Sequence, residues 1–185
     1  MLTALFPDPA SEAYAFMAVV LVLLYLLLRW RSAARQRKKD RSSEIWVLVD
    51  GSNVMHWLDN KPQLAPVLQV VKHLKALGYV PGVVFDANAG WKLEGRYLHD
   101  GDFAKLLKLE PRQVMVVSKG TPADPFLLMT ADEFGAKIVT NDRFRDWAEA
   151  HPKVKESGFL IRGGYRNTGE FWLEDVTRQP ASAAA

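Results

Sequence analysis

The sequence of 185 residues contains no cysteine. This absence excludes a disulfide scaffold, and it excludes zinc-finger and iron–sulfur sites that depend on thiolate ligands. The patterns G-x-G-x-x-G and G-x-x-x-x-G-K-[ST] are also absent, which disfavours the common nucleotide-binding folds. Metal-ligand spacing is missing among the histidines, which are His56, His73, His99 and His151. Carboxylates are therefore the main groups left for metal or acid–base chemistry.

Excess basic charge is lacking from most of the chain. Residues 1–43 hold seven Lys/Arg and three Asp/Glu, a net charge of +4, whereas the remainder holds 17 and 18, a net charge of −1. The sequence pI of about 9.1 therefore comes from the front segment. It is no evidence that the remainder binds nucleic acid.

One long apolar run, AYAFMAVVLVLLYLLL, extends from Ala13 to Leu28, with Tyr14 and Trp30 near its ends. Roughly 20 apolar residues cross a bilayer core, and aromatic side chains favour its two interfaces. The basic stretch RWRSAARQRKK follows at once, an order that keeps the C-terminal side in the cytoplasm. A cleaved signal peptide has its charges before the run. A buried core helix is a second alternative, but this run offers no polar face to solvent.

We therefore expect a single-pass anchor in the lipid of the inner (cytoplasmic) membrane, with the N-terminus outside and the main domain in the cytoplasm. The expected segments are an external tail at 1–12, a transmembrane helix at 13–30, a basic linker at 31–43, a folded domain at 44–176 and a flexible tail at 177–185.

From residue 44 the sequence alternates between short apolar runs and amphipathic segments. Strands are predicted at 45–49, 80–85, 114–117 and 137–140, and helices at 64–77, after a cap at Asp102, at 125–134 and at 142–150. A final short strand or hairpin is predicted from 159–161 and 170–173. This alternation predicts an α/β fold with a mainly parallel sheet and helices on both faces.

Aspartates follow the predicted strands. Asp50 and Asp86 end the first and second strands, Asp142 follows the fourth, Asp146 lies one helical turn later, and Asp124 opens the helix after the third. Ligands of open α/β sheets bind beyond the carboxyl ends of the strands, so these acids are expected to converge. Convergent carboxylates repel one another unless a cation such as Mg²⁺ or Mn²⁺ lies among them. Such an ion, or a pair of ions, can activate water for attack on a phosphodiester.

Each aspartate also has a structural interpretation. Asp50 fits a turn, Asp124 and Asp142 fit helix caps, and Asp146 fits a surface ion pair with Arg143 or Arg145. Their joint placement is what favours a site.

Two segments carry a resemblance to a known family. The segment VLVDGSNVMHW (Val47–Trp57) resembles the opening of the NYN ribonucleases, a branch of the PIN-like nucleases. PADPFLLMTADEFGAKIVTNDRFRDW (Pro122–Trp147) is similar to the Regnase-type members in particular. The resemblance spans about Ile45–Leu173. It implies a three-layer PIN-like (Rossmann-like) domain and a metal-dependent endoribonuclease that hydrolyses phosphodiester bonds of mainly single-stranded RNA.

By resemblance, the acids that hold Mg²⁺ or Mn²⁺ are Asp50, Asp124, Asp142 and Asp146, with Asp86 as a further candidate. The implied catalytic set adds Asn53, which would orient the site or contact the scissile phosphate, with Asn141 and Ser52 beside it. Regnase-type members often have two adjacent acids where this chain has Ala123 and Asp124. The zinc finger of the family is absent.

Basic, polar and aromatic side chains near these loops are candidates for holding RNA through charge and stacking. The set proposed for RNA binding is Ser52, Trp91, Lys119, Arg143 and Arg145, and the same chemistry is present at His56, Trp57, Lys92, Arg96 and Arg166.

Two other functions remain open at this point. One is a catalytically weak or inactive PIN-like module that binds RNA or a protein at the membrane, an interpretation that Ala123 keeps open. The other is a haloacid-type phosphatase, which requires D-x-D after the first strand, whereas this chain has Asp50-Gly51-Ser52. An oligomer is compatible with the sequence and is not indicated by it.

Overall fold

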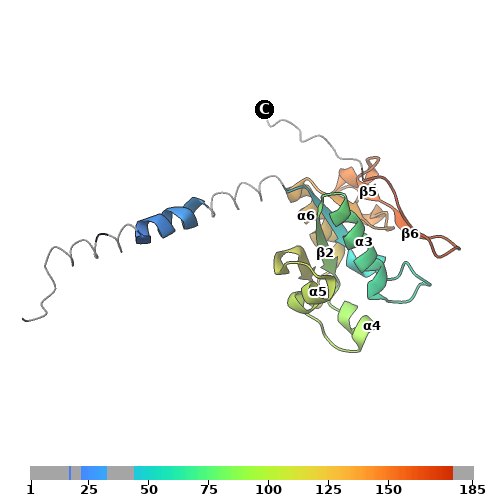
Figure 1. The fold of residues 1–185 in the computed structure, drawn as a ribbon. Coiled ribbons are helices and arrows are strands. Elements are labelled where there is room, and N and C mark those ends of the chain that lie inside the picture. Colours follow the sequence, from blue (N-terminus) through green and yellow to red (C-terminus); the bar gives the residue numbers. More distant parts are fainter. Residues whose placement is uncertain (1–16, 18–21, 33–43, 177–185) are drawn as a thin grey trace, which may run out of the picture. The chain divides into compact units, whose positions relative to one another are not determined.

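The structure, a computed structural model, describes residues 17, 22–32 and 44–176 (Figure 1). The chain divides into two units, Met1–Glu44 and Ile45–Ala185. Both hydrophobic core clusters lie within the second unit. This unit therefore has the core of an independently folding domain.

In the first unit, the described residues 22–32 are helical, and their large apolar side chains are exposed from Val22 to Leu28. Within the described residues, no helix is both long and apolar enough to cross a membrane. The predicted span at 13–30 lies partly outside those residues. The predicted tails at 1–12 and 177–185, and most of the linker at 31–43, also lie outside them.

The second unit is built on a sheet of five parallel strands in the order β3-β2-β1-β4-β5. The predicted mainly parallel sheet is thus confirmed. Its strands are short apolar runs because both faces are covered. They are β1 (Trp46–Asp50), β2 (Val80–Phe85), β3 (Val114–Val116), β4 (Lys137–Val139) and β5 (Leu160–Ile161).

Helices cover both faces of this sheet (Figure 1). Helices α3 and α5 pack with Val49 and Phe85 in one core cluster, and α6 packs with Leu48 and Ile138 in the other. This gives the predicted three layers. The helices are α2 (Gly51–Val54), α3 (Leu64–Ala76), α4 (Ala89–Glu94), α5 (Asp100–Leu107) and α6 (Ala123–Phe134), and the 3-10 turns are η1 (Pro111–Gln113), η2 (Arg145–Trp147) and η3 (Pro152–Lys155).

The chain turns from β1 into α2 at Gly51, where there is no room for a side chain. A Cβ atom at this position would lie 2.5 Å from Cε1 of Phe85. The Phe85 ring is itself stacked on Phe103 of α5, with ring centroids 4.0 Å apart. Close contact with a fixed aromatic pair therefore sets the direction in which the chain leaves Asp50.

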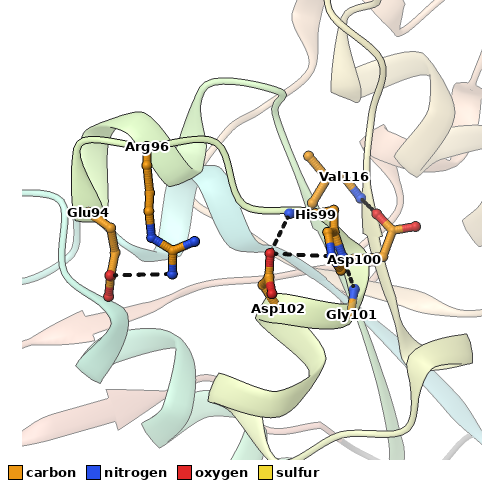
Figure 2. Close-up of polar contacts among 7 residues, drawn as sticks. All are labelled: Glu94, Arg96, His99, Asp100, Gly101, Asp102 and Val116. Carbon is orange, nitrogen blue, oxygen red and sulfur yellow. Dashed lines mark hydrogen bonds and ion pairs between the residues drawn. The ribbon is translucent and has the colours of Figure 1, made fainter.

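The outer edge of β3 is closed by the start of α5 (Figure 2). Asp100 Oδ1 accepts a hydrogen bond from the backbone N–H of Val116 at 2.8 Å, which occupies a donor on the edge strand. His99 caps the helix by accepting from Gly101 N–H at 3.0 Å, and Asp102 accepts from His99 N–H at 3.2 Å. The prediction of Asp102 as the cap was wrong, because His99 takes that position. An edge strand filled in this way resists pairing with another strand.

The segment after β4 differs from the predicted helix at 142–150. Asp142 Oδ1 accepts from the backbone N–H of Phe144 at 2.8 Å, a local bond that competes with helix formation. Phe144 takes a left-handed conformation with φ of +46° and is only 2% exposed. The helix prediction was therefore wrong, and only the turn η2 forms.

The last predicted strand or hairpin is present as two separate features. Strand β5 joins the main sheet beside β4, and the hairpin is formed by β6 (Gly163–Tyr165) and β7 (Phe171–Leu173).

Candidate functional site

Asp50 lies at the carboxyl end of β1 and is the most buried of the candidate acids, with 8% of its surface exposed. One carboxylate oxygen accepts from the backbone N–H of Asn53 at 3.0 Å, and the other accepts from the Thr140 hydroxyl at 2.9 Å. These two bonds come from α2 and from the end of β4. They hold the carboxylate in one orientation at the edge of the sheet.

The environment of Asp50 disfavours its charged form. Burial raises its pKa from 3.8 to about 7, the hydrogen bonds from Asn53 and Thr140 oppose this shift, and the charges of Asp124 and Asp86 add to it. A carboxylate in this position holds a proton more readily than usual, and nearby positive charge stabilises its ionised form.

Asp124, in the first turn of α6, is affected by the same group of acids. Its pKa is raised by burial and then by the charges of Asp142 and Asp86, whereas a hydrogen bond from the Trp147 side chain lowers it. The charges of Asp86 and Asp124 act on Asp50, and those of Asp86 and Asp142 act on Asp124, so these four carboxylates are neighbours at this end of the sheet. Their role as metal ligands stays a prediction.

Asp146 is not part of this arrangement. It is exposed in the turn η2, and it is not among the charges that raise the pKa of Asp50 or Asp124. Asp146 was expected one helical turn after Asp142, but no α-helix forms there, and Asp146 lies in the 3-10 turn η2.

Thr140 links two of the acids and was missed from the sequence. Its buried hydroxyl donates to Asp50 and accepts from the backbone N–H of Asp142 at 3.0 Å. The signal that was available is a hydroxyl residue at the end of a buried strand, directly before Asn141 and Asp142. Thr140 fixes the position of the Asp142 backbone relative to the Asp50 carboxylate.

Asn53 joins α2 to the loop after β4. Its Oδ1 accepts from the backbone N–H of Asn141 at 3.0 Å and from the indole N–H of Trp57 at 2.8 Å. Because both partners are donors, the acceptor must be the amide oxygen. The amide nitrogen has no hydrogen-bond partner within the described residues, so it can donate to a ligand. Trp57 is thus tied to the site and is not a free stacking surface.

Ser52 and Asn141 serve as supports for the strand ends. The Ser52 hydroxyl accepts from the backbone N–H of Asp86 at 2.8 Å. The Asn141 side chain donates to the carbonyl of Gly163 at 2.8 Å and accepts from its N–H at 3.3 Å. Ser52 therefore positions the end of β2, and Asn141 positions β6 against the loop of β4.

The other candidates for RNA binding lie on the surface. Lys119, Arg143 and Arg145 are exposed and form no ion pair among the described residues, and Trp91 on α4 is 59% exposed. Two of the weaker candidates are paired with acids, Arg96 with Glu94 at 3.9 Å and Arg166 with Glu170 at 3.2 Å.

The four carboxylates fit a hard divalent cation by their chemistry. Within the described residues, no three acidic or histidine side chains stand close enough to form a ready-made cage. Mg²⁺ does not require one, because it keeps several water ligands and commonly binds through one or two carboxylates. Burial first, and repulsion between the acids second, raises the pKa of Asp50 and Asp124, and a bound cation would oppose both effects.

We expect Asp50→Asn to stabilise the metal-free domain at neutral and alkaline pH. The pKa of Asp50 is higher in the fold than its ordinary value of 3.8. Its favourable contribution to the free energy of unfolding is therefore complete below about pH 4. That contribution, a few kcal/mol, is lost as pH rises to about 7. Thermal unfolding in a chelator, measured across this pH range, should show the unfolding temperature of the variant rising relative to that of the parent as pH rises. Parallel curves for the two proteins would contradict the assignment.

Comparisons with known proteins identify a matching family and a similar fold. Residues 43–159 match the family described as the Zc3h12a-like ribonuclease NYN domain. Nothing among curated proteins matches the chain.

Solved structures similar to this chain include two of one plant protein. One is the crystal structure of nuclear proteinaceous RNase P 2 (PRORP2) from Arabidopsis thaliana, with a TM-score of 0.56 and 16% identity over 95% of this chain and 38% of that chain. A second structure of that protein has a TM-score of 0.46 at 16% identity, over 94% of this chain and 38% of that one. The chain thus spans well under half of PRORP2, and the first likeness shows a shared fold. Because the family match covers more than half of the sequence, this chain belongs to the Zc3h12a-like NYN ribonuclease domain family.

Proposed function

We propose that this chain is a divalent-metal-dependent endoribonuclease that hydrolyses mainly single-stranded RNA. The observation that carries the proposal is the buried Asp50 carboxylate, whose pKa is raised to about 7 beside three further aspartates. This arrangement is costly when the acids are ionised and unneutralised. It becomes favourable when a cation is bound, which is a property of metal sites that act on phosphates.

Asp50, Asp124 and Asp142 are the residues that would hold Mg²⁺ or Mn²⁺, with Asp86 beside them. Such an ion would activate a water and would neutralise charge on the phosphodiester. The chain's own groups keep the acids in place: Thr140 fixes Asp50 and the Asp142 backbone, and Trp147 holds Asp124.

Asn53 is placed to contact the substrate directly. Its oxygen is held by two donors, so its amide nitrogen keeps a fixed direction. That group can donate a hydrogen bond to a phosphate oxygen at the site. A donor of this kind contributes to rate when it meets charge that develops during the reaction.

RNA affinity would come from local contacts, because the main part of the chain has a net charge of −1. The exposed cations Lys119, Arg143 and Arg145 supply phosphate contacts, and Trp91 offers a ring for stacking an unpaired base. Stacking on exposed aromatic side chains favours single strands over duplexes.

Ala123 stands where Regnase-type members often have a second acid, and the proposed site does not use a ligand there. Its side chain is 8% exposed and packs in the core cluster of α6. An acid at this position would be buried among apolar neighbours. Asp124, the next residue, is the acid that α6 supplies to the proposed site.

Cleavage of RNA by the domain beginning at Glu44 tests this proposal. With Mn²⁺ or Mg²⁺ and a labelled single-stranded RNA, we expect internal cuts by the parent. Asp124→Asn and Asp142→Asn should lose activity by about 100-fold or more. Asp146→Asn is the matched control and should remain active, because Asp146 is not one of the four neighbouring aspartates of the proposed site.

A parent protein that binds RNA but does not cut it would favour the alternative of a catalytically weak RNA-binding module. Equal cleavage by Asp142→Asn and the parent would also overturn the proposed site.

We also propose that the chain is anchored in the inner membrane by residues 13–30, with the catalytic domain in the cytoplasm. The apolar run from Ala13 to Leu28 and the basic stretch from Arg29 support this location. Exposed apolar side chains from Val22 to Leu28 agree with a lipid environment.

Fractionation of cells expressing the full chain tests the anchor. We expect the full chain in the membrane pellet after alkaline extraction, and the chain beginning at Glu44 in the supernatant. Protease added to spheroplasts should leave the domain intact. Full-length protein in the supernatant, or digestion of the domain from outside, would contradict the proposed location.

A further inference from the structure

The register of the sheet places Arg162 at the same level along the strands as Asp50. Val139 lies opposite both Val49 of β1 and Ile161 of β5, and Thr140 N–H donates to the Ile161 carbonyl at 3.0 Å. One residue further along, Asp50, Thr140 and Arg162 therefore occupy neighbouring positions on three adjacent strands. With strands about 4.8 Å apart, the backbones of Asp50 and Arg162 are about 10 Å apart.

The same register places these three residues on one face of the sheet. Side chains two residues apart on a strand share a face. Two residues before Asp50, Thr140 and Arg162 are Leu48, Ile138 and Leu160, and all three pack in the cluster that contains α6. Arg162 therefore belongs to the face from which α6 presents Asp124.

The guanidinium group of Arg162 is directed toward the loop after β4, which carries Asp142. Its Nη1 donates to the backbone carbonyl of Asn141, the residue between Thr140 and Asp142. The N–H of Asn141 is in turn bound to Asn53. Arg162 thus contacts the loop that carries one acid and supports another site residue.

The charge of Arg162 is not neutralised by an acid. Three other arginines of the domain pair with glutamates, Arg96 with Glu94, Arg112 with Glu110 and Arg166 with Glu170. Arg162 forms no such pair among residues 44–176. Glu174 lies close by, but its carboxylate accepts from the backbone N–H of Arg162 at 3.0 Å.

These observations describe a built position for an anion. The hydrogen bond to a neutral carbonyl orients the guanidinium without cancelling its charge. An arginine in this state presents further N–H donors in the forked geometry that matches phosphate oxygens. On the opposite side of the acids, exposed Lys119 follows β3 at the same edge of the sheet.

We propose that Arg162 binds a backbone phosphate of the RNA next to the scissile one, on the β5 side of the acids. A bound single strand then crosses the carboxyl edge of the sheet between Lys119 and Arg162, with the scissile phosphate over Asp50. The inference rests on the proposed ribonuclease function. It adds a substrate-positioning residue and a path for the strand.

The salt dependence of RNA affinity tests this position. Full-length protein carrying Asp142→Asn, which blocks cleavage, is titrated with a short fluorescent oligouridylate at several salt concentrations. We expect Arg162→Gln to weaken binding by about tenfold. The slope of log affinity against log salt should fall in magnitude by about 0.7, the value for one phosphate contact on a single strand.

Arg112→Gln is the matched control, because it removes the same charge at the opposite end of the strands. The Arg112 guanidinium lies 5.3 Å from the ring centroid of Trp46, the first residue of β1. This variant should keep the parent slope. An unchanged slope in Arg162→Gln, or an equal fall in both variants, would overturn the inference.

Kinetics separate phosphate binding from mere support of the Asn141 loop. In protein with Asp142 intact, loss of a phosphate contact outside the scissile position should raise KM and leave kcat near the parent value. A structural role predicts the reverse, a fall in kcat with an unchanged salt slope.

Thermal unfolding checks that Arg162→Gln is folded. Should it unfold, Arg162→Lys serves in its place, because lysine keeps the charge but lacks the fork. The inference then expects weaker binding with the parent slope, and a reduced slope would contradict it. Failure of the proposed function is distinguishable, since it appears as absence of cleavage by the parent while the salt slopes still report on Arg162.

Discussion

The buried carboxylate of Asp50 is the constraint on which the site depends. It is held by the Thr140 hydroxyl from β4 and the Asn53 backbone from α2, and it has little access to water. Two hydrogen bonds do not offset the loss of hydration, so the pKa of Asp50 stays raised. The fold therefore keeps a carboxylate where its charge is favourable only beside a cation. The charges of the neighbouring acids Asp124 and Asp86 make that requirement stronger.

Hydrogen bonds to backbone groups position this cluster with few side-chain contacts between the acids. Ser52 holds the end of β2 through Asp86, Asn53 holds the loop of β4 through Asn141, and Thr140 holds Asp142. Each support is a short polar residue in α2 or directly after β4, so these hydrogen bonds tie the segments that follow the strands to one another. At the outer strand β3, by contrast, the Asp100 side chain accepts a hydrogen bond from the backbone N–H of Val116. This N–H on the outer side of the sheet is therefore occupied, whereas the carboxyl ends of the strands remain accessible to a ligand.

The sequence predicts the parallel sheet and the helices α3 and α6 because their apolar periodicity matches the faces that they bury. It also predicts the location of the site, because the carboxyl ends of parallel strands meet at one edge. It misplaces Asp146, because burial of Phe144 in a left-handed conformation outweighs the helical pattern of that segment. Thr140 leaves only a weak signal in the sequence, a hydroxyl at a strand end, and Arg162 leaves none. Their relation to Asp50 depends on the register between strands far apart in the chain.

The central claim is that the acid group around Asp50 binds a divalent metal, and Mn²⁺ binding measured by calorimetry above pH 7 tests it most directly. We expect the domain to bind Mn²⁺, with Asp50→Asn weakening the affinity by about 10-fold to 100-fold. Asp146→Asn should bind like the parent, since it lies outside the group. A parent that does not bind Mn²⁺, or an Asp50→Asn variant that binds it equally well, would contradict the claim.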